Sequence, residues 1–477
     1  MRRPLFAFAV VSILASAPLL ANNWPHWRGP THNGLSAETG LPVKWGAECI
    51  KRDAPASAPA EAAIESPDGA QQGRGRGRGG QNPDPPAPPP CAEYKTDGVA
   101  WNLPLPAYSG STPIIWNDTI FLSMATANGS GDLELWAVDR NKKDVMWKRP
   151  IAGGNHIERK QNMSSPSPVT DGTRVWVMTG VGMLKAFDFK GTELWSRDVQ
   201  SEYGRFGLNW GYASSPLLHG EALYIQVLHG MKTDDPSYVF KVDKMSGKTL
   251  WKVERPTAAQ RESPDSYTTP LWLESGGKSE VVVSGGDAVT GHDPATGKEL
   301  WRVDGLNPQN RGDYRIVASP TVMGGLIVSP SRNNPLTAIK PGGSGLINDT
   351  HIAWQFASGP DVPTPVSDGK YIYVVVDTGV VYCLEVATGK VVYGPERLPS
   401  DFYSASPVLA DGKIYVTGES NGITTVFRAG PKFEVLSSNS LGDSCTPYCL
   451  STVAVSQGQL FVRLSENLWV IGDRKTK

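Results

Sequence analysis

A nine-residue pattern that returns along the chain constrains the fold more than any other feature. It is clearest in "DPATGKELW", residues 293–301, where a polar turn leads into a short strand that carries a tryptophan. A residue needed once in every repeat serves the fold, so we expect these aromatic rings to pack between neighbouring repeats. Related stretches are "DFKGTELW" (188–195), "DKMSGKTLW" (243–251), "DRNKKDVMW" (139–147) and, more weakly, "EVATGKVVY" (385–393).

A second signature, Ser or Thr followed by Pro, opens each unit. Its spacing of 42 to 55 residues is typical of a propeller array rather than of separate domains. Each spacing holds four alternating apolar strands joined by Gly and Asp turns. We therefore predict an all-β fold, an eight-bladed β-propeller of four-stranded antiparallel blades. The pairs are Thr112-Pro113, Ser167-Pro168, Ser215-Pro216, Thr269-Pro270, Ser319-Pro320, Thr364-Pro365 and Ser406-Pro407. Thr452-Val453 stands at the eighth position with the same spacing but without the proline.

The last unit supplies only three strands before the chain ends. A spare strand stands at the other end of the repeats, in "GVAWNLPLP", residues 98–106, with Trp101 at the repeated aromatic position. We expect this N-terminal strand to pair with the C-terminal blade and close the ring. Closure would protect sheet edges that would otherwise be exposed.

These turn motifs resemble the pyrroloquinoline quinone (PQQ) repeat family, whose pattern is A-x-D-x-x-T-G-x-x-x-W. "AFDFKGTELW" and "GHDPATGKELW" match it well, whereas blades five, seven and eight depart from it. Three longer stretches, "NWPHWRGPTHNGLS", "PGGSGLINDTHIAW" and "GPKFEVLSSNSLGD", resemble secreted bacterial PQQ-like propeller proteins. The resemblance covers nearly all of residues 23–473 except one insert. It implies the propeller fold, which quinoprotein alcohol dehydrogenases share with an outer-membrane-assembly scaffold lipoprotein.

The first residues are typical of a signal peptide. Arg2 and Arg3 precede an apolar run, and small residues lead to a cleavage position near Ala21. The alternative is a retained membrane anchor, for which the run is short. We expect an exported protein, periplasmic or extracellular, with no transmembrane segment in the mature chain. The predicted organisation is a signal peptide (1–21), an N-terminal segment (22–48), a low-complexity insert (49–95) and the propeller (96–477).

The insert contains "APASAPAEAA", "GRGRGRGG" and "NPDPPAPPP", compositions for which we expect disorder. Its Arg-Gly repeat would suit an RNA-binding tail, but a solvated loop fits an exported protein better. A formal net charge of −1 does not favour nucleic acid as a partner. We expect a Cys49–Cys91 disulfide at the base of the insert and a reduced, buried Cys383. Cys445 and Cys449 are a second candidate pair.

The best ligand-site candidates lie just before the Ser/Thr-Pro pairs, where the chain enters each innermost strand at one mouth of the central channel. Aromatic rings with a few polar groups around a cavity favour a peptide, saccharide or small-molecule site. The alternative is that these rings only fill the channel. The candidates are Tyr108, Asn162, Asn209, Trp210, Tyr212, Tyr267, Tyr314, Arg315, Phe402, Tyr403 and Tyr448.

We interpret the chain as a non-catalytic binding or scaffold protein that uses this mouth. The alternative is a PQQ- and calcium-dependent dehydrogenase of alcohols or sugars, in which Asp265 and Asp313 would be the catalytic carboxylates. The sequence has neither the adjacent cysteine pair of many quinoprotein alcohol dehydrogenases nor a C-x-x-C-H haem motif. PQQ and calcium are therefore not the favoured ligands, and the sequence assigns no metal site.

Overall fold

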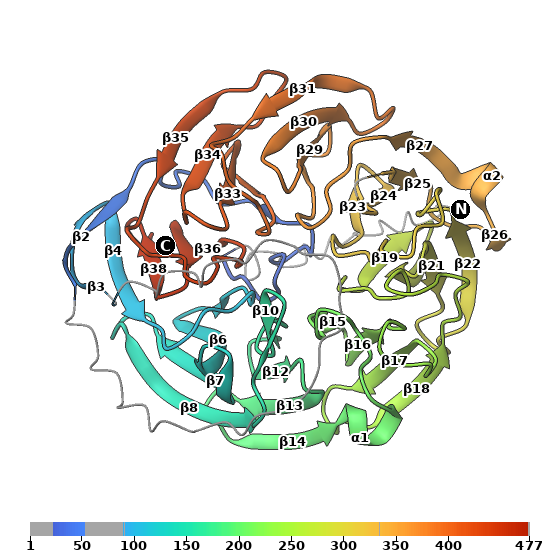
Figure 1. The fold of residues 1–477 in the computed structure, drawn as a ribbon, viewed down its shortest axis with the longest axis horizontal. Coiled ribbons are helices and arrows are strands. Elements are labelled where there is room, and N and C mark those ends of the chain that lie inside the picture. Colours follow the sequence, from blue (N-terminus) through green and yellow to red (C-terminus); the bar gives the residue numbers. More distant parts are fainter. Residues whose placement is uncertain (1–21, 53–88, 90, 333, 476–477) are drawn as a thin grey trace, which may run out of the picture.

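Eight four-stranded blades surround a central channel in the computed structural model (Figure 1). The structure describes residues 22–52, 89, 91–332 and 334–475, so the predicted signal peptide and most of the insert lie outside the described residues. The predicted all-β eight-bladed propeller is confirmed. No helix within the described ranges is both long enough and apolar enough to cross a membrane.

Within each blade the strands run antiparallel from the channel outward. The first four blades are β5–β8 (Ile114–Trp116, Thr119–Ala127, Ser130–Asp139, Asp144–Ala152), β11–β14 (Val169–Thr170, Arg174–Met178, Met183–Asp188, Glu193–Asp198), β15–β18 (Leu217–His219, Ala222–Val227, Tyr238–Asp243, Thr249–Glu254) and β19–β22 (Leu271–Ser275, Lys278–Gly285, Ala288–His292, Glu299–Asp304).

The next three blades follow the same order. They are β23, β24, β25 and β27 (Thr321–Met323, Leu326–Ser329, Leu336–Ile339, Ile352–Phe356), β28–β31 (Val366–Ser367, Tyr371–Val375, Val380–Glu385, Val391–Arg397) and β32–β35 (Val408–Ala410, Lys413–Thr417, Thr424–Arg428, Val435–Asn439). Short elements connect or flank the blades: α1 (Val199–Tyr203), α2 (Asn348–His351), β9 and β10 (Ile157–Glu158, Gln161–Asn162), β26 (Gly345–Leu346) and β1 (Leu35–Ser36).

The eighth blade combines the two ends of the repeat array. Its inner strands are β36–β38 (Ala454–Ser456, Gln459–Arg463, Asn467–Ile471), and its outermost strand is β4 (Val99–Pro104). The pairing of β38 with β4 is antiparallel, with Val470 opposite Trp101 and Leu468 opposite Leu103. The strand that completes the ring therefore comes from the N-terminal side of the array.

Four of the repeated tryptophans join their blade to the next, as the sequence predicted. In these four the indole N–H donates to a backbone carbonyl in the turn of the following blade, at 2.9 to 3.1 Å. The indole of Trp301 differs, because it donates to Glu280 of its own blade, at 2.7 Å. The turn glycine lies against the ring, so a side chain there would collide with it. The pairs are Trp147 with Phe189 and Gly191, Trp195 with Lys244 and Gly247, Trp251 with Pro294 and Gly297, and Trp354 with Val386 and Gly389.

Residues at both ends of the insert form strands, which differs from the disorder expected for residues 49–95. The strands β2 (Gly46–Arg52) and β3 (Cys91–Asp97) pair as an antiparallel hairpin, and Cys49 is bonded to Cys91. Low-complexity composition begins only beyond these strands, so it carried no information about them. Cys445 is bonded to Cys449, and Cys383 is buried and free opposite Tyr393.

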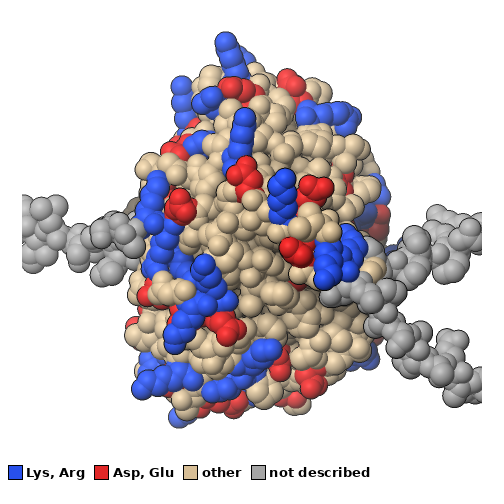
Figure 2. All heavy atoms as spheres, turned by 90° about the vertical axis from the view of Figure 1, so that its left-hand side faces the viewer, with Lys and Arg blue, Asp and Glu red and all other residues tan. Residues whose placement is uncertain are grey.

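The outer side of the ring near this hairpin carries charges of both signs. Figure 2 shows Lys and Arg side chains interspersed with Asp and Glu over this face rather than gathered in one patch. A surface of this kind does not provide the continuous basic stripe that a polyanion such as nucleic acid requires.

Candidate functional site

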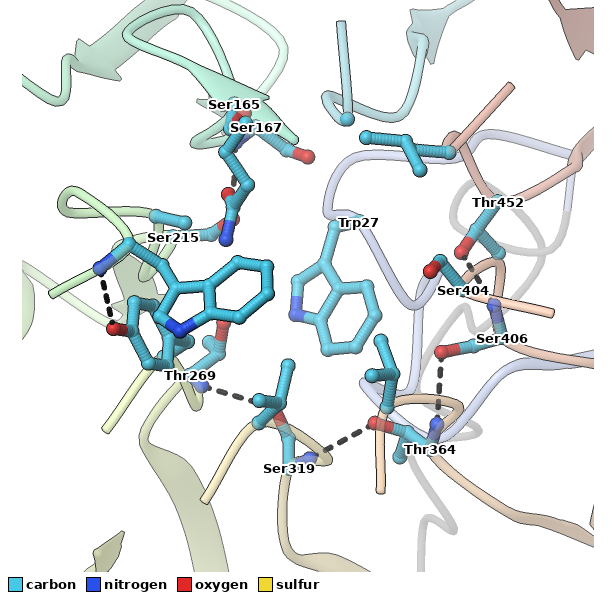
Figure 3. A pocket seen from close by; sticks show the side chains of 18 of the residues that line it. Trp27, Ser165, Ser167, Ser215, Thr269, Ser319, Thr364, Ser404, Ser406 and Thr452 are labelled. Atoms are coloured by element: carbon cyan, nitrogen blue, oxygen red, sulfur yellow. Dashed lines mark hydrogen bonds between the residues drawn. The ribbon is translucent and has the colours of Figure 1, made fainter. Parts of the chain in front are cut away.

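The N-terminal segment closes one end of the central channel. Trp24 pairs with Ile115, the middle residue of the innermost strand of the first blade, by two backbone hydrogen bonds. Further along, β1 pairs in parallel with the innermost strand β32. Between these attachments Trp27 projects into the middle of the channel (Figure 3). The sequence did not identify Trp27 as a channel residue.

Arg28 attaches the N-terminal segment to two of the blades. Its guanidinium donates to the carbonyls of Pro407, at 2.7 Å, and Pro365, at 2.9 Å, in two neighbouring blades. The side chain is buried, and burial lowers its pKa to about 9. Gly34, with φ of +77°, packs on the guanidinium, where a Cβ would lie 2.4 Å from Cζ. The segment is thus an integral part of the propeller and leaves the opposite mouth as the open one.

The Ser/Thr-Pro signature builds a ring of hydroxyl groups around Trp27. In six places among the described residues, the backbone N–H of one member donates to the hydroxyl oxygen of a member in the next blade, at 2.9 to 3.1 Å (Figure 3). These bonds fasten neighbouring innermost strands together. The members of this hydroxyl ring are Thr112, Ser167, Ser215, Thr269, Ser319, Thr364, Ser406 and Thr452.

A second ring, two residues earlier in each blade, lines the channel toward the open mouth. Residues i and i+2 of an extended chain point the same way, so both rings face the channel axis. This upper ring consists mostly of small or apolar side chains and encloses a cavity of about 140 Å³ whose lining also includes Trp27. Its members are Gly110, Ser165, Ala213, Tyr267, Val317, Val362, Ser404 and Leu450.

At the open mouth, two guanidinium groups lie over the indole of Trp210. Arg315 Cζ is 4.9 Å and Arg159 Cζ is 5.2 Å from the ring centroid, both within range of a cation–π contact. The indole N–H donates to Glu262, at 2.7 Å, and Arg315 also contacts Asp361, at 3.2 Å. Trp210 is thereby fixed as a rigid wall of the cavity.

Across the mouth, Lys160 forms the other charged part of the lining. Its ammonium contacts Glu419, at 2.9 Å, and donates to the Ser404 hydroxyl, also at 2.9 Å. Among the described residues that line the cavity, the charged side chains are those of Lys160 and Arg315, and none is Asp or Glu. The acidic partners lie outside the lining, so the wall itself presents cations beside apolar surface.

Of the ligand-site residues predicted from sequence, Trp210, Tyr267 and Arg315 line the cavity. Several other predicted residues use their polar atoms inside the fold. Tyr108, Tyr212 and Tyr403 are buried, and their hydroxyls donate to the carbonyls of Lys160, Gln226 and Pro399. Asn162 is also buried and donates to the Tyr108 carbonyl.

The remaining predicted residues surround the cavity without lining it. Tyr314 is buried and its hydroxyl donates to the Asn334 carbonyl. Tyr448 packs edge-on against Tyr108, with ring centroids 6.2 Å apart. Asn209 donates its backbone N–H to Asp265, and Phe402 is 60% exposed.

The two carboxylates proposed for a dehydrogenase have structural partners. Asp265 is buried and accepts three backbone N–H bonds, from Asn209, Gly230 and Met231, although burial raises its pKa to about 7. Asp313 forms ion pairs with Arg311 and Arg332, each at 2.8 Å, and the hydrogen bond from Arg311 lowers its pKa to about 2. Neither lines the cavity.

This arrangement does not fit a calcium-bound quinone. A calcium ion takes six to eight oxygen ligands, many of them carboxylate, and the lining contains no carboxylate among its described residues. Three metal-ligand groups come together in the described chain only at Asp443, Cys445 and Cys449, whose sulfurs are bonded to each other. The cavity of about 140 Å³ is also below the roughly 300 Å³ at which small-molecule sites begin.

A ring of eight four-stranded blades built on Asp-turn-Trp repeats defines a PQQ-repeat propeller. The chain belongs to the family described as outer membrane protein assembly factor BamB, whose matches at residues 97–253, 235–356 and 285–429 together span more than half of it. No curated protein matches the sequence significantly.

Solved structures of two functional classes share the fold. BamB from Moraxella catarrhalis is 15% identical, with a TM-score of 0.54 over 78% of this chain and 98% of that one. A quinohemoprotein alcohol dehydrogenase from Comamonas testosteroni is 10% identical, with a TM-score of 0.62 over 96% of this chain and 82% of that one. A europium-containing methanol dehydrogenase is 13% identical, with a TM-score of 0.59 over 77% and 85%. The TM-scores establish a common fold, and identities this low leave the activity to be argued from the site.

Proposed function

We propose that this chain is an exported binding protein that holds a protein or peptide partner at the open mouth of its channel without catalytic turnover. The observation that carries the proposal is the composition of the cavity wall. Cations, hydroxyl groups, aromatic rings and small apolar side chains line it, and the nearby carboxylates already have partners. Such a wall can bind, but it offers no general base and no set of metal ligands.

Three further features support this function. The N-terminal segment holds Trp27 in the channel, which limits access to one face. Two disulfides suit an oxidising compartment, in agreement with the signal-peptide pattern. The matched family is described as an outer membrane protein assembly factor, which is consistent with a protein partner. A saccharide or small molecule would compete for the same cavity and is the weaker candidate because the cavity is small.

Selection from a random peptide library displayed on phage tests the proposal. The full chain should enrich peptides that bind the open mouth, and Arg315→Gln should weaken the selected peptides by about tenfold or more because a cation of the wall is lost. Leu250→Ala, on the outer face of β18, is the matched control and should bind as the parent does. Enriched peptides whose affinity is the same for all three proteins would place the binding surface elsewhere.

A further inference from the structure

The channel cavity has the size of one side chain. Its volume is about 140 Å³, and a cavity of about 150 Å³ in another protein accommodates a single benzene ring. The room exists because six of the eight upper-ring positions hold glycine, alanine, serine or valine: Gly110, Ser165, Ala213, Val317, Val362 and Ser404. Trp27 stands on the axis at the level of the hydroxyl ring and limits the depth (Figure 3).

The wall of this cavity combines aliphatic, hydroxyl-bearing and cationic side chains. Val317, Val362 and Leu450 supply aliphatic surface. Lys160 and Arg315 supply positive charge, and their acidic partners Glu419 and Asp361 are outside the lining. An occupant that complements both the aliphatic and the cationic residues of the wall combines an apolar group that fits the cavity with a negative charge beside it.

We propose that the channel cavity receives one phenyl-sized or branched aliphatic side chain, such as that of Phe or Leu, from an acidic segment of a partner protein. The inference rests on the proposed function and names the recognised chemistry. The apolar side chain enters along the channel axis toward Trp27 and Trp210, and neighbouring carboxylates of the segment approach Lys160 and Arg315. Buried single anchors of this kind commonly dominate the affinity of protein interfaces.

Two substitutions of opposite effect test the size of the recognised group. Ala213→Leu fills the cavity and should weaken a Phe-anchored acidic peptide from the phage selection by about tenfold or more, the cost of leaving such a side chain exposed. Leu450→Ala enlarges the cavity and should shift the preference of the selected peptides from Phe or Leu toward Trp. Equilibrium binding is measured by titration of fluorescein-labelled peptides, and thermal melts verify that each variant is folded.

Independent probes separate this inference from the proposed function. N-acetyl-phenylalaninamide and N-acetyl-leucinamide should show saturation transfer from the parent protein that Ala213→Leu abolishes, whereas N-acetyl-lysinamide should show none. Suppose that peptides bind and that Arg315→Gln weakens their binding, but that Ala213→Leu changes the binding of neither the peptides nor the amides. The anchor inference is then wrong, whereas the proposed binding of a partner at the open mouth still holds. If the parent enriches no peptide, the proposed function fails and the anchor inference fails with it.

Discussion

The indole N–H of Trp251 donates to the backbone carbonyl of Pro294 in the next blade, at 3.0 Å. Gly297 of the same turn packs on the ring, where a Cβ would lie 2.6 Å from the nearest indole carbon. Aspartate, glycine and tryptophan of the repeat are therefore parts of one contact between blades. The same contact with the turn of the next blade is made by Trp147, Trp195 and Trp354, which explains why the motif recurs.

Trp251→Ala should lower the free energy of unfolding by about 2–3 kcal/mol, because the substitution removes both an aromatic contact and a hydrogen bond between blades. Gly297→Val should also destabilise the protein, since the side chain displaces the indole and the backbone has φ of +78°. Chemical denaturation measures both. Leu250→Ala is the control: its side chain is 54% exposed, and a change within about 0.5 kcal/mol is expected.

The pairing of β4 with β38 leads to a second testable prediction, about ring closure. Deletion of residues 98–106 would leave β38 as an unpaired edge and remove Trp101. We expect aggregation or a melting temperature well below that of the parent, because exposed edges invite pairing with other chains. Trp101→Ala, which keeps the strand, should have a smaller effect. Melting of the deletion variant at the parental temperature would show that β4 does not hold the ring closed.

The fold could be predicted because its signals are periodic. The Ser/Thr-Pro spacing and the turn motifs each recur, and Cys383 was recognised as buried from the residues at equivalent positions, such as Ala186. The β2–β3 hairpin escaped prediction because it occurs once. Trp27 was missed for the same reason: its position depends on the attachment of Arg28 and Trp24 to distant blades.

The ligand-site candidates were chosen near one mouth of the channel, and three of them, Trp210, Tyr267 and Arg315, line the cavity. Residues were chosen for being aromatic, and Tyr108, Tyr212 and Tyr403 prove to be buried. The upper ring follows from the alternation of side chains along an extended chain. The residue two positions before each Ser or Thr of the signature points toward the channel axis, as that Ser or Thr does. Tyr267 is aromatic and also stands at such a position, and it lines the cavity.

Acid should loosen the N-terminal segment. The rings of His26 and His32 lie 3.9 Å apart. Burial lowers the pKa of both, that of His32 to about 4, and the neighbouring His219 lowers them further. The folded state therefore binds fewer protons than the unfolded state, in which the histidines have a pKa of about 6.5. Their contribution to stability is complete above that pH and is lost as the pH falls toward about 4.

Other groups oppose this effect in the whole protein. Burial raises the pKa of Asp265 to about 7 and that of Asp287 to about 6, so these carboxyls favour the folded state as the pH falls through the same range. The comparison must therefore be between the parent and His32→Asn, a residue that tolerates the φ of +58° at this position. Between about pH 7.5 and pH 5, the melting temperature should fall less in His32→Asn than in the parent. Equal slopes would exclude titration of His32 as a contribution.

Binding without turnover is the central claim, and reconstitution with PQQ and calcium tests it most directly. The purified full chain is incubated with both, and dye-linked oxidation of alcohols and aldose sugars is followed. Because the cavity is small and Asp265 and Asp313 have structural partners, we predict no oxidation above that of the protein-free mixture. Turnover that disappears in Asp313→Ala or Asp265→Asn, while thermal melts show that the variant remains folded, would contradict the account and establish a dehydrogenase.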